Sequence, residues 1–259
     1  MSIDIRTDAA RYYDLNPDFP KDILFYKDQI PSINAKILEL GCGTGRVTIP
    51  ISQECEKVHG IDLSEAMVAI CREKLTNKGI PKSKITVEVG DITNFNLDLK
   101  FDLIIAPFRV FQNLETDQQV KGLFECIRKH LAPQGNCILN VFKPNRDRDR
   151  LQREWCTEIE ELNWEVIFED EKIACYDRRP RMDKEKLILY PELIYRKYKN
   201  NVLTDETVLK IAMRCYYPDE FEELIKSYRF RIIEKWGGYN GEKYGQGLEL
   251  VVKFKSGAA

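Results

Sequence analysis

The chain has 259 residues, of which 43% are hydrophobic and 32% are charged, and its formal net charge at pH 7 is −2. This length suits one large α/β domain, or one domain that carries a sizeable insertion. The near balance of charges gives no electrostatic reason to expect a nucleic acid or an anionic membrane as a partner. No apolar stretch approaches the length that is needed to span a bilayer. Only two histidines are present, so a metal site built on histidine is not expected.

The eight cysteines form no Cys-x-x-Cys pair, and several of them lie inside apolar segments. The N-terminal segment is charged and polar, and it lacks the apolar core of a secretory signal. Both features favour free thiols in a reducing compartment. We therefore expect a cytoplasmic protein without a metal centre.

Apolar segments alternate with helix-like segments in the first half of the chain. We expect strands at residues 36–40, 57–62, 84–91, 101–107 and 136–142, and helices at residues 46–55, 64–79 and 116–131. Strands that are apolar over most of their length favour a parallel sheet covered by helices on both faces. Ser64 is expected to cap the second of these helices, and Gly79 to end it.

The pattern changes after Phe142, where a charged break at residues 143–152 begins the second half. Three long segments rich in β-branched and aromatic residues then predict an antiparallel three-stranded meander, at residues 163–179, 184–198 and 202–217. Turn signals separate these segments at Arg179–Asp183 and Asn200–Asn201. A helix that starts at Pro218 and two closing strands joined by a short connection complete the chain. The short connection predicts an antiparallel end to the main sheet.

The first strand is followed by a glycine loop, Gly-Cys-Gly-Thr-Gly-Arg, at residues 41–46. A dinucleotide-binding loop has the pattern G-x-G-x-x-G, so the third glycine comes one position too early here. Glu39 lies two residues before the loop in a strand that should be buried, and an unpaired buried carboxylate is unfavourable. A cationic ligand group would relieve this burial, whereas a pyrophosphate would not. The alternative is that Glu39 pairs with a structural arginine or lysine, or with backbone donors.

Two further acids end the second and third predicted strands. Asp62 comes 21 residues after Gly41 and can accept hydrogen bonds from two ribose hydroxyls. Asp91 lies at the next carboxyl edge, where ligands of open α/β sheets bind. Acids at three successive strand ends suit a ligand with hydroxyls and amino groups better than a polyphosphate. Asp62 could instead cap the following helix, although Ser64 already occupies the capping position.

The segments ILELGCGTG, GIDLSEAM, VEVGDI, FDLIIAPF and LAPQGNCILNVF resemble, in this order, the class I S-adenosylmethionine-dependent methyltransferases. The resemblance covers residues 37–142 and implies S-adenosylmethionine as cofactor and S-adenosylhomocysteine as product. It also implies a role for each matching position. Gly41 and Gly43 would admit the methionine part of the cofactor, and its ammonium group would face Glu39 and donate a hydrogen bond to the carbonyl of Ala106. Asp62 would bind the ribose. The adenine would be flanked by Leu63 and Met67, bound by Asp91 and backed by Ile92.

Two other parts of the chain resemble small-molecule members of this family. Tyr13, which the resemblance makes a cofactor-binding candidate, belongs to a Tyr-Tyr-Asp segment like their N-terminal lid. The insert after the fifth strand is similar to that of sugar-amine and glycine N-methyltransferases. The expected fold is therefore an α/β protein with a doubly wound, mostly parallel seven-stranded sheet, an antiparallel last strand and a small antiparallel insert sheet. Its expected parts are an N-terminal helical lid (1–36), a cofactor-binding core (37–150), the insert (151–216) and the C-terminal part of the core sheet (217–259).

The predicted function is methyl transfer to a nitrogen or oxygen atom of a small molecule by direct in-line displacement, without an assigned catalytic residue. The fourth strand is followed by Ala-Pro-Phe, unlike the Asn/Asp-Pro-Pro-aromatic signature of enzymes that methylate planar nitrogens. The acceptor-site candidates are Arg109, Phe111, Tyr216 and Tyr239. Arg109 could instead be an exposed loop residue, and Tyr216 could belong to a strand core.

Several alternatives remain open from the sequence. They are an RNA or protein methyltransferase, a noncatalytic S-adenosylmethionine-binding protein and an NAD(P)-dependent reductase. A basic cluster at residues 178–186 is interleaved with acids, which favours a solvated turn over a nucleic-acid site. We expect no membrane partner, and the exposed edges of the insert sheet offer a surface for a homodimer.

Overall fold

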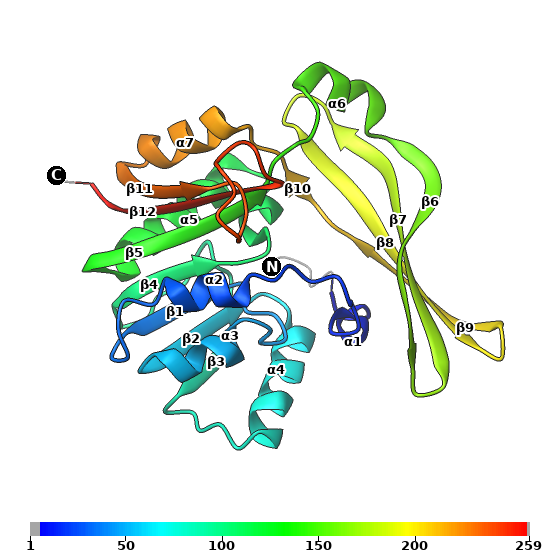
Figure 1. Ribbon diagram of the computed structural model, residues 1–259, viewed down its shortest axis with the longest axis horizontal. Coiled ribbons are helices and arrows are strands. Elements are labelled where there is room, and N and C mark those ends of the chain that lie inside the picture. Colours follow the sequence, from blue (N-terminus) through cyan, green and yellow to red (C-terminus); the bar gives the residue numbers. More distant parts are fainter. Residues whose placement is uncertain (1–5, 258–259) are drawn as a thin grey trace.

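The computed structural model describes residues 6–257, which form two β-sheets with helices packed around the larger one (Figure 1). The strand order of the larger sheet is β11-β12-β5-β4-β1-β2-β3. Strands β1 to β5 of this sheet pair in parallel, while β12 is antiparallel to both β5 and β11. The strands are β1 (Lys36–Leu40), β2 (Lys57–Asp62), β3 (Ile85–Val89), β4 (Phe101–Ala106), β5 (Leu131–Phe142), β11 (Phe230–Trp236) and β12 (Glu249–Ser256). The predicted fold class is confirmed.

Both faces of the larger sheet are buried, which explains the apolar strands. Successive residues of a strand point to opposite faces. Accordingly, Ile37 of β1 packs in one core cluster with side chains of α2 (Ile23–Asp28) and α3 (Thr48–Ile51). Leu38 packs in another with side chains of α5 (Asp117–His130) and α7 (Pro218–Ser227). A short 3-10 turn, η1 (Ser52–Glu54), continues α3.

The signals for helix ends act as expected from the sequence. The Ser64 side chain accepts a hydrogen bond from the Met67 amide and so caps α4 (Glu65–Asn77). Gly79 follows this helix with a φ of 63°, a left-handed conformation that favours glycine. Pro218 occupies the first turn of α7. Local sequence chemistry therefore sets these boundaries.

The smaller sheet is antiparallel, as predicted, but it has five strands and not the predicted three. The strands are β6 (Thr157–Phe168), β7 (Glu171–Asp183), β8 (Ile188–Lys199), β9 (Val202–Lys210) and β10 (Met213–Arg214). The first predicted segment contains a tight turn at Glu169 and Asp170, both with positive φ, and neither residue is a glycine or proline that would mark it. The expected turn at Asn200–Asn201 is present. The turn expected at Arg179–Asp183 instead follows β7, because the strand continues to Asp183.

A short helix, α6 (Arg148–Glu154), occupies the segment that the sequence suggested as a charged break. The Asp147 side chain caps it by accepting a hydrogen bond from the Arg150 amide. A helix of this length is too short to display a clear amphipathic period. Its buried residue Leu151 packs in an apolar cluster with Trp155 and with Leu187 and Leu189 near the start of β8.

The N-terminal segment lies beside both sheets (Figure 1). Its first helix, α1 (Ala10–Tyr13), places Tyr12 in a stack on Tyr195 of β8, with ring centroids 5.2 Å apart. Residues 1–5 of the expected lid lie outside the described part. Among residues 6–257, no helix combines the length and apolar character required to cross a membrane. All eight cysteines are free, and all but Cys156 are buried.

Candidate functional site

A cavity of about 720 Å³ lies between the carboxyl edge of the larger sheet and the inner face of the smaller one. The glycine loop, the segments after β2, β3 and β4, and helix α1 all contribute to its wall. Nine of the ten predicted cofactor residues line it, namely Tyr13, Glu39, Gly41, Gly43, Asp62, Leu63, Met67, Asp91 and Ile92. Ala106 is the exception, because it is fully buried, whereas the adjacent Pro107 reaches the cavity.

The glycine loop is tightly constrained by its surroundings. Gly41 has a φ of 72°, and a Cβ atom there would lie 2.4 Å from a methyl group of Val110. Gly43 has a φ of 53°, and a Cβ atom there would contact Met67. Both positions therefore require glycine for conformation, and Gly41 also requires it for space.

Asp62 is held in place through both of its carboxylate oxygens. Oδ2 accepts a hydrogen bond from the Gly43 amide at 2.8 Å, and Oδ1 accepts one from the Ser64 amide at 2.8 Å. Ser64, not Asp62, caps helix α4. The carboxylate is thereby oriented at the cavity wall with acceptor capacity left for a ligand.

Glu39 is a buried acid without a cationic hydrogen-bond partner in the described residues. Its side chain is 2% exposed, and Oε2 accepts a hydrogen bond from the Thr48 hydroxyl at 2.5 Å. Burial raises the pKa of Glu39 to about 8. The nearby Arg46 forms its hydrogen bonds with Asp22 instead, at 2.6 Å and 2.8 Å. Thus the alternative of a direct pair between Glu39 and a structural arginine does not hold, and the carboxyl borders the cavity.

A set of contacts that the sequence did not reveal ties the N-terminal segment to the glycine loop. Asp14 accepts hydrogen bonds from the Thr44 hydroxyl at 2.7 Å and pairs with Lys74 at 2.6 Å. Arg46 also lies over the ring of Phe19, 5.0 Å from its centroid. In the sequence, only the Tyr-Tyr-Asp segment indicated that the N-terminal segment lies against the cofactor-binding part of the chain.

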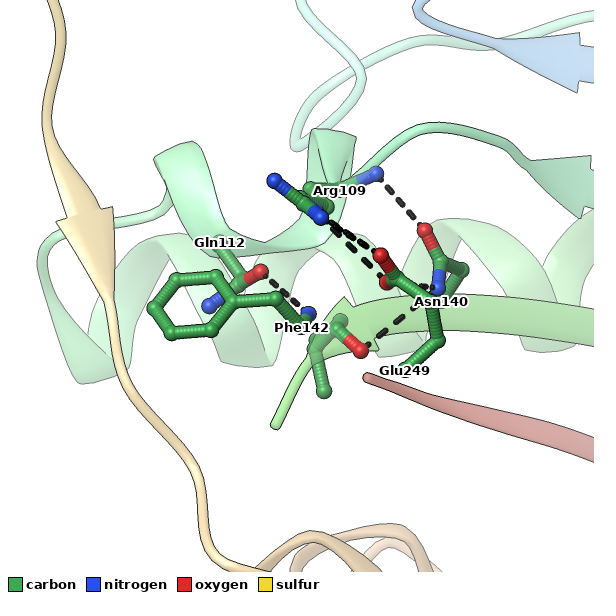
Figure 2. Close-up of polar contacts among 6 residues, drawn as sticks. Arg109, Gln112, Asn140, Phe142 and Glu249 are labelled. Carbon is green, nitrogen blue, oxygen red and sulfur yellow. Dashed lines mark hydrogen bonds and ion pairs between the residues drawn. The ribbon is translucent and has the colours of Figure 1, made fainter. Parts of the chain in front are cut away.

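The loop after β4 has an unusual backbone that neighbouring strands hold in place. Phe108 and Arg109 have φ values of 50° and 68°, which side-chain-bearing residues rarely adopt. Figure 2 shows the contacts: the Arg109 amide donates to Asn140 at 2.9 Å, and the Asn140 amide group donates to Glu249 at 2.8 Å. The Arg109 guanidinium reaches Glu249 at 2.5 Å. This loop forms part of the cavity wall, so strands β5 and β12 determine its shape.

The 3-10 turn η2 (Val110–Asn113) follows this loop and is anchored by Gln112. The Gln112 side chain accepts a hydrogen bond from the Phe142 amide at 2.8 Å and donates one to the Arg214 carbonyl at 2.9 Å. Gln112 therefore connects strand β5 of the larger sheet with β10 of the smaller one. Figure 2 shows the first of these contacts.

The structure does not bring three of the four acceptor-site candidates to the cavity. Phe111 and Tyr216 are buried together in the core, with ring centroids 5.4 Å apart, so the core alternative holds for Tyr216. Tyr239 packs against Phe25 in the opposite core cluster. Aromatic side chains suit a core as well as a ligand, and the sequence could not separate the two uses. Arg109 alone lines the cavity, and Glu249 already binds its guanidinium.

The inner face of the smaller sheet supplies wall residues that sequence reasoning missed. Leu189, Pro191, Leu193 and Tyr195 alternate along β8 and line the cavity. This period of two could have identified the face. The other wall residues from this sheet include Asn163, Asp177, Arg179, Leu209 and Met213.

Comparisons with known proteins find similarities to the central part of the chain. Residues 37–135 match the family described as methyltransferase domain. The chain is 32% identical over 110 residues to malonyl-[acyl-carrier protein] O-methyltransferase of Priestia megaterium, a match that covers 41% of this chain and 36% of that protein. It is 27% identical over 108 residues to dTDP-3-amino-3,4,6-trideoxy-alpha-D-glucopyranose N,N-dimethyltransferase of Streptomyces venezuelae, covering 42% and 43%. The chain thus spans less than half the length of these relatives.

The fold similarity extends over nearly the whole chain. A crystal structure described as an S-adenosylmethionine-dependent methyltransferase from Clostridium acetobutylicum aligns with a TM-score of 0.75 at 17% identity. The alignment covers 97% of this chain and 98% of that one. At this identity the likeness concerns the fold, which includes the smaller sheet.

Proposed function

We propose that this chain is an S-adenosylmethionine-dependent methyltransferase that transfers a methyl group to a nitrogen or oxygen atom of a small molecule, which agrees with the match of residues 37–135 to the methyltransferase domain family. The observation that carries the proposal is Glu39, a buried carboxyl at the cavity wall without a cationic hydrogen-bond partner in residues 6–257. The ammonium group of S-adenosylmethionine would provide that partner. A dinucleotide pyrophosphate would add a negative charge at the same place.

The other residues of the wall fit the same cofactor. Gly41 and Gly43 leave bare backbone where a side chain would collide or project, so that the methionine part can approach. Asp62, oriented through the amides of Gly43 and Ser64, is suited to the ribose hydroxyls. We assign the adenine to the part of the wall formed by Leu63, Met67, Asp91 and Ile92.

The sulfonium group of the cofactor supplies an electrophilic methyl group when it is bound. The chain therefore needs no covalent nucleophile, and its own contribution is to align the acceptor and to keep water out. The network of Arg109, Asn140 and Glu249 serves alignment, since it fixes the loop after β4 at the cavity.

The cavity that would hold the cofactor and the acceptor together has the size of a small-molecule site. Its volume of about 720 Å³ lies within the range of ~300–1,000 Å³ that is typical of small-molecule sites. The smaller sheet covers the cavity on the acceptor side. The two relatives named above methylate a malonyl group on its carrier protein and a nucleotide-linked amino sugar, so both nitrogen and oxygen acceptors occur among them. A cytoplasmic location stays a prediction, and so does a homodimer. The exposed apolar side chains of Ile159 and Ile167 on the edge strand β6 support a homodimer.

Calorimetry tests cofactor binding directly. We expect S-adenosylhomocysteine to bind and NADH not to bind. Asp62→Ala should weaken binding at least about tenfold, because it removes hydrogen bonds to a ligand. Asp98→Ala, which changes an exposed acid outside the cavity, should leave the affinity unchanged. Absence of S-adenosylhomocysteine binding would refute the proposal.

A second measurement identifies the acceptor class. The protein is incubated with methyl-labelled S-adenosylmethionine and a cell extract, and the label is then separated into metabolite, RNA and protein fractions. The proposal expects label in the metabolite fraction and its loss with Asp62→Ala. Label in RNA or protein instead would favour the alternative acceptors, and binding without any transfer would favour a noncatalytic protein.

A further inference from the structure

We infer that Asp177 recognises the methyl acceptor, and that the acceptor is an amine on a largely apolar skeleton. The inference rests on the proposed methyltransferase function and deepens it by naming the substrate class. It assigns the cofactor to the edge of the larger sheet and the acceptor to the inner face of the smaller sheet.

The position of Asp177 in the smaller sheet supports this assignment. Asp177 of β7 lies directly opposite Leu193 of β8, and Leu193 lies opposite Leu209 of β9. Cross-strand neighbours project from the same face of a sheet. All three residues line the cavity, and Glu161 of β6 lies opposite Asp177 on its other side, so the carboxylate stands where the acidic end of this row meets its apolar part.

The hydrogen-bonding capacity of Asp177 is not used within the described residues. The only ion pair that its carboxylate forms there is with Arg179, whose Nε lies 3.5 Å from Oδ2. That Nε atom is itself buried and has no hydrogen-bond partner in residues 6–257. Partial burial of Asp177 also raises its pKa, with Arg179 acting in the opposite direction. The Asp177 side chain is 28% exposed, so its remaining acceptor positions are open to donors from water or from a ligand in the cavity.

The local balance of charge favours a cationic donor. Arg179 also binds Glu161, with Nη2 3.1 Å from Oε2, so two carboxylates share one guanidinium. The surplus is one negative charge beside the cavity. An ammonium group would neutralise this charge, whereas a carboxylate acceptor would add to it.

The other charged groups of the wall agree with an amine. Arg46 is bound to Asp22, Arg109 to Glu249 and Arg146 to Glu154, so these three guanidinium groups are already paired with carboxylates. Arg6, which also lines the cavity, donates a hydrogen bond to Asn113. Lys143, beyond the end of β5, also lines the cavity and has no ion pair with a described residue. It provides the competing site for an anion, which the experiment below includes.

The chemistry of the transfer is consistent with a carboxylate at this position. The amine first loses a proton to water, and its lone pair then forms the new N–C bond while the S–C bond breaks. Positive charge passes from sulfur to nitrogen. The ionised Asp177 would bind the amine before transfer and stabilise the charge that develops on it.

Three probes with one skeleton test the inference: cyclohexylamine, cyclohexanol and cyclohexanecarboxylate. Each is titrated by NMR into the protein loaded with S-adenosylhomocysteine. The amine should bind at least about tenfold more tightly than the alcohol or the carboxylate, because hydrogen bonds to charged groups are the stronger ones. In Asp177→Asn this preference should disappear, while the affinity for the alcohol stays unchanged.

The controls separate recognition from folding and from the proposed function. Glu206→Gln removes a charge that pairs with Arg196 on the same sheet but outside the cavity, and it should keep the amine preference. S-adenosylhomocysteine must bind wild type and Asp177→Asn alike, which confirms their folding. If wild type fails to bind it, the proposed function fails. If wild type does bind it, three results overturn the inference and leave the proposed function intact. These are tighter binding of the carboxylate than of the amine, an amine preference that survives Asp177→Asn, and no binding of any probe.

Discussion

Arg109 and Glu249 form an ion pair, Nη2 to Oε1 at 2.5 Å, that joins the loop after β4 to the strand β12. The two residues are 140 positions apart in the sequence. Glu249 is the less exposed partner, with 12% of its side chain accessible against 35% for Arg109. Glu249 also accepts a hydrogen bond from the side chain of Asn140 in β5, which in turn accepts one from the Arg109 amide. Glu249 therefore stabilises both the guanidinium of Arg109 and, through Asn140, its backbone.

Replacing Glu249 should therefore affect both stability and activity. Glu249→Ala leaves Arg109 and Asn140 without their common acceptor, and we expect a loss of about 1–3 kcal/mol in the free energy of unfolding. Urea denaturation measures it. As a control, Glu125→Ala removes the exposed partner of Lys121 and should cost less than about 1 kcal/mol. Equal effects of the two changes would contradict a special role for Glu249.

Gly41 and Gly79 offer a matched pair for testing the glycine loop. Both have positive φ, but a Cβ atom on Gly41 would collide with Val110, whereas one on Gly79 would meet nothing within 4 Å. Gly79→Ala should cost about 1 kcal/mol from backbone strain alone. Gly41→Ala should cost more and also weaken S-adenosylhomocysteine binding. Val110→Ala should recover part of that loss, and failure to recover any would place the cause elsewhere than in the collision.

The raised pKa of Glu39 predicts a proton release on cofactor binding. Burial raises this pKa to about 8, so the carboxyl is mostly protonated at pH 7 in the ligand-free protein. An ammonium group beside it would favour the ionised form, and binding would release about one proton. Calorimetry at pH 7 in buffers of different ionisation enthalpy measures this number. Glu39→Gln should abolish the release, and an unchanged release would assign it to another group.

The same shift predicts how the stability of the ligand-free protein depends on pH. The folded pKa of Glu39 lies above its ordinary value of 4.5, so folding favours the protonated form. The resulting stabilisation is complete below pH 4.5 and is lost as the pH rises through about 8. Unfolding free energies of wild type should therefore fall relative to Glu39→Gln over this range. A constant difference between the two proteins would contradict the shift.

Asp22 and Arg46 form the most buried ion pair of those at the cavity. The Asp22 side chain is inaccessible and that of Arg46 is 12% exposed. Asp22→Ala would leave a buried charge without its partner, and we expect a loss of about 3–5 kcal/mol on urea denaturation. Glu54→Ala, at the half-exposed pair with Lys27, should cost less than about 1 kcal/mol. A small effect of Asp22→Ala would show that solvent reaches Arg46.

The main sheet could be predicted because its strands are buried on both faces. Burial on both faces requires apolar strands such as Ile37–Leu40. Glu39 is the exception in this strand, and its acidic side chain indicated the ligand site. Asp62 and Asp91 could be assigned to the site for a related reason, because they follow neighbouring strands at the same carboxyl edge of the sheet. Local signals for helix caps were also sufficient, as at Ser64.

Other features depend on contacts that no local pattern carries. The pair of Arg109 and Glu249 joins distant segments, and the turn at Glu169 and Asp170 has no glycine or proline to mark it. Phe111 and Tyr216 were assigned to the acceptor because aromatic side chains serve ligands and cores alike. Asp177 was interpreted from the sequence as one of the acids that interleave the basic cluster, and only cross-strand pairing places it beside Leu193.

Strand β12 lies between β5 and β11, in the interior of the larger sheet. A nascent chain therefore cannot close this sheet until residues 249–256 have left the ribosome and entered the gap between two strands that were made earlier. Such long-range pairing is slow compared with local folding. Since Glu249 belongs to this strand and fixes the loop at the cavity, the proposed methyl-transfer site would be among the last parts of the molecule to mature after synthesis.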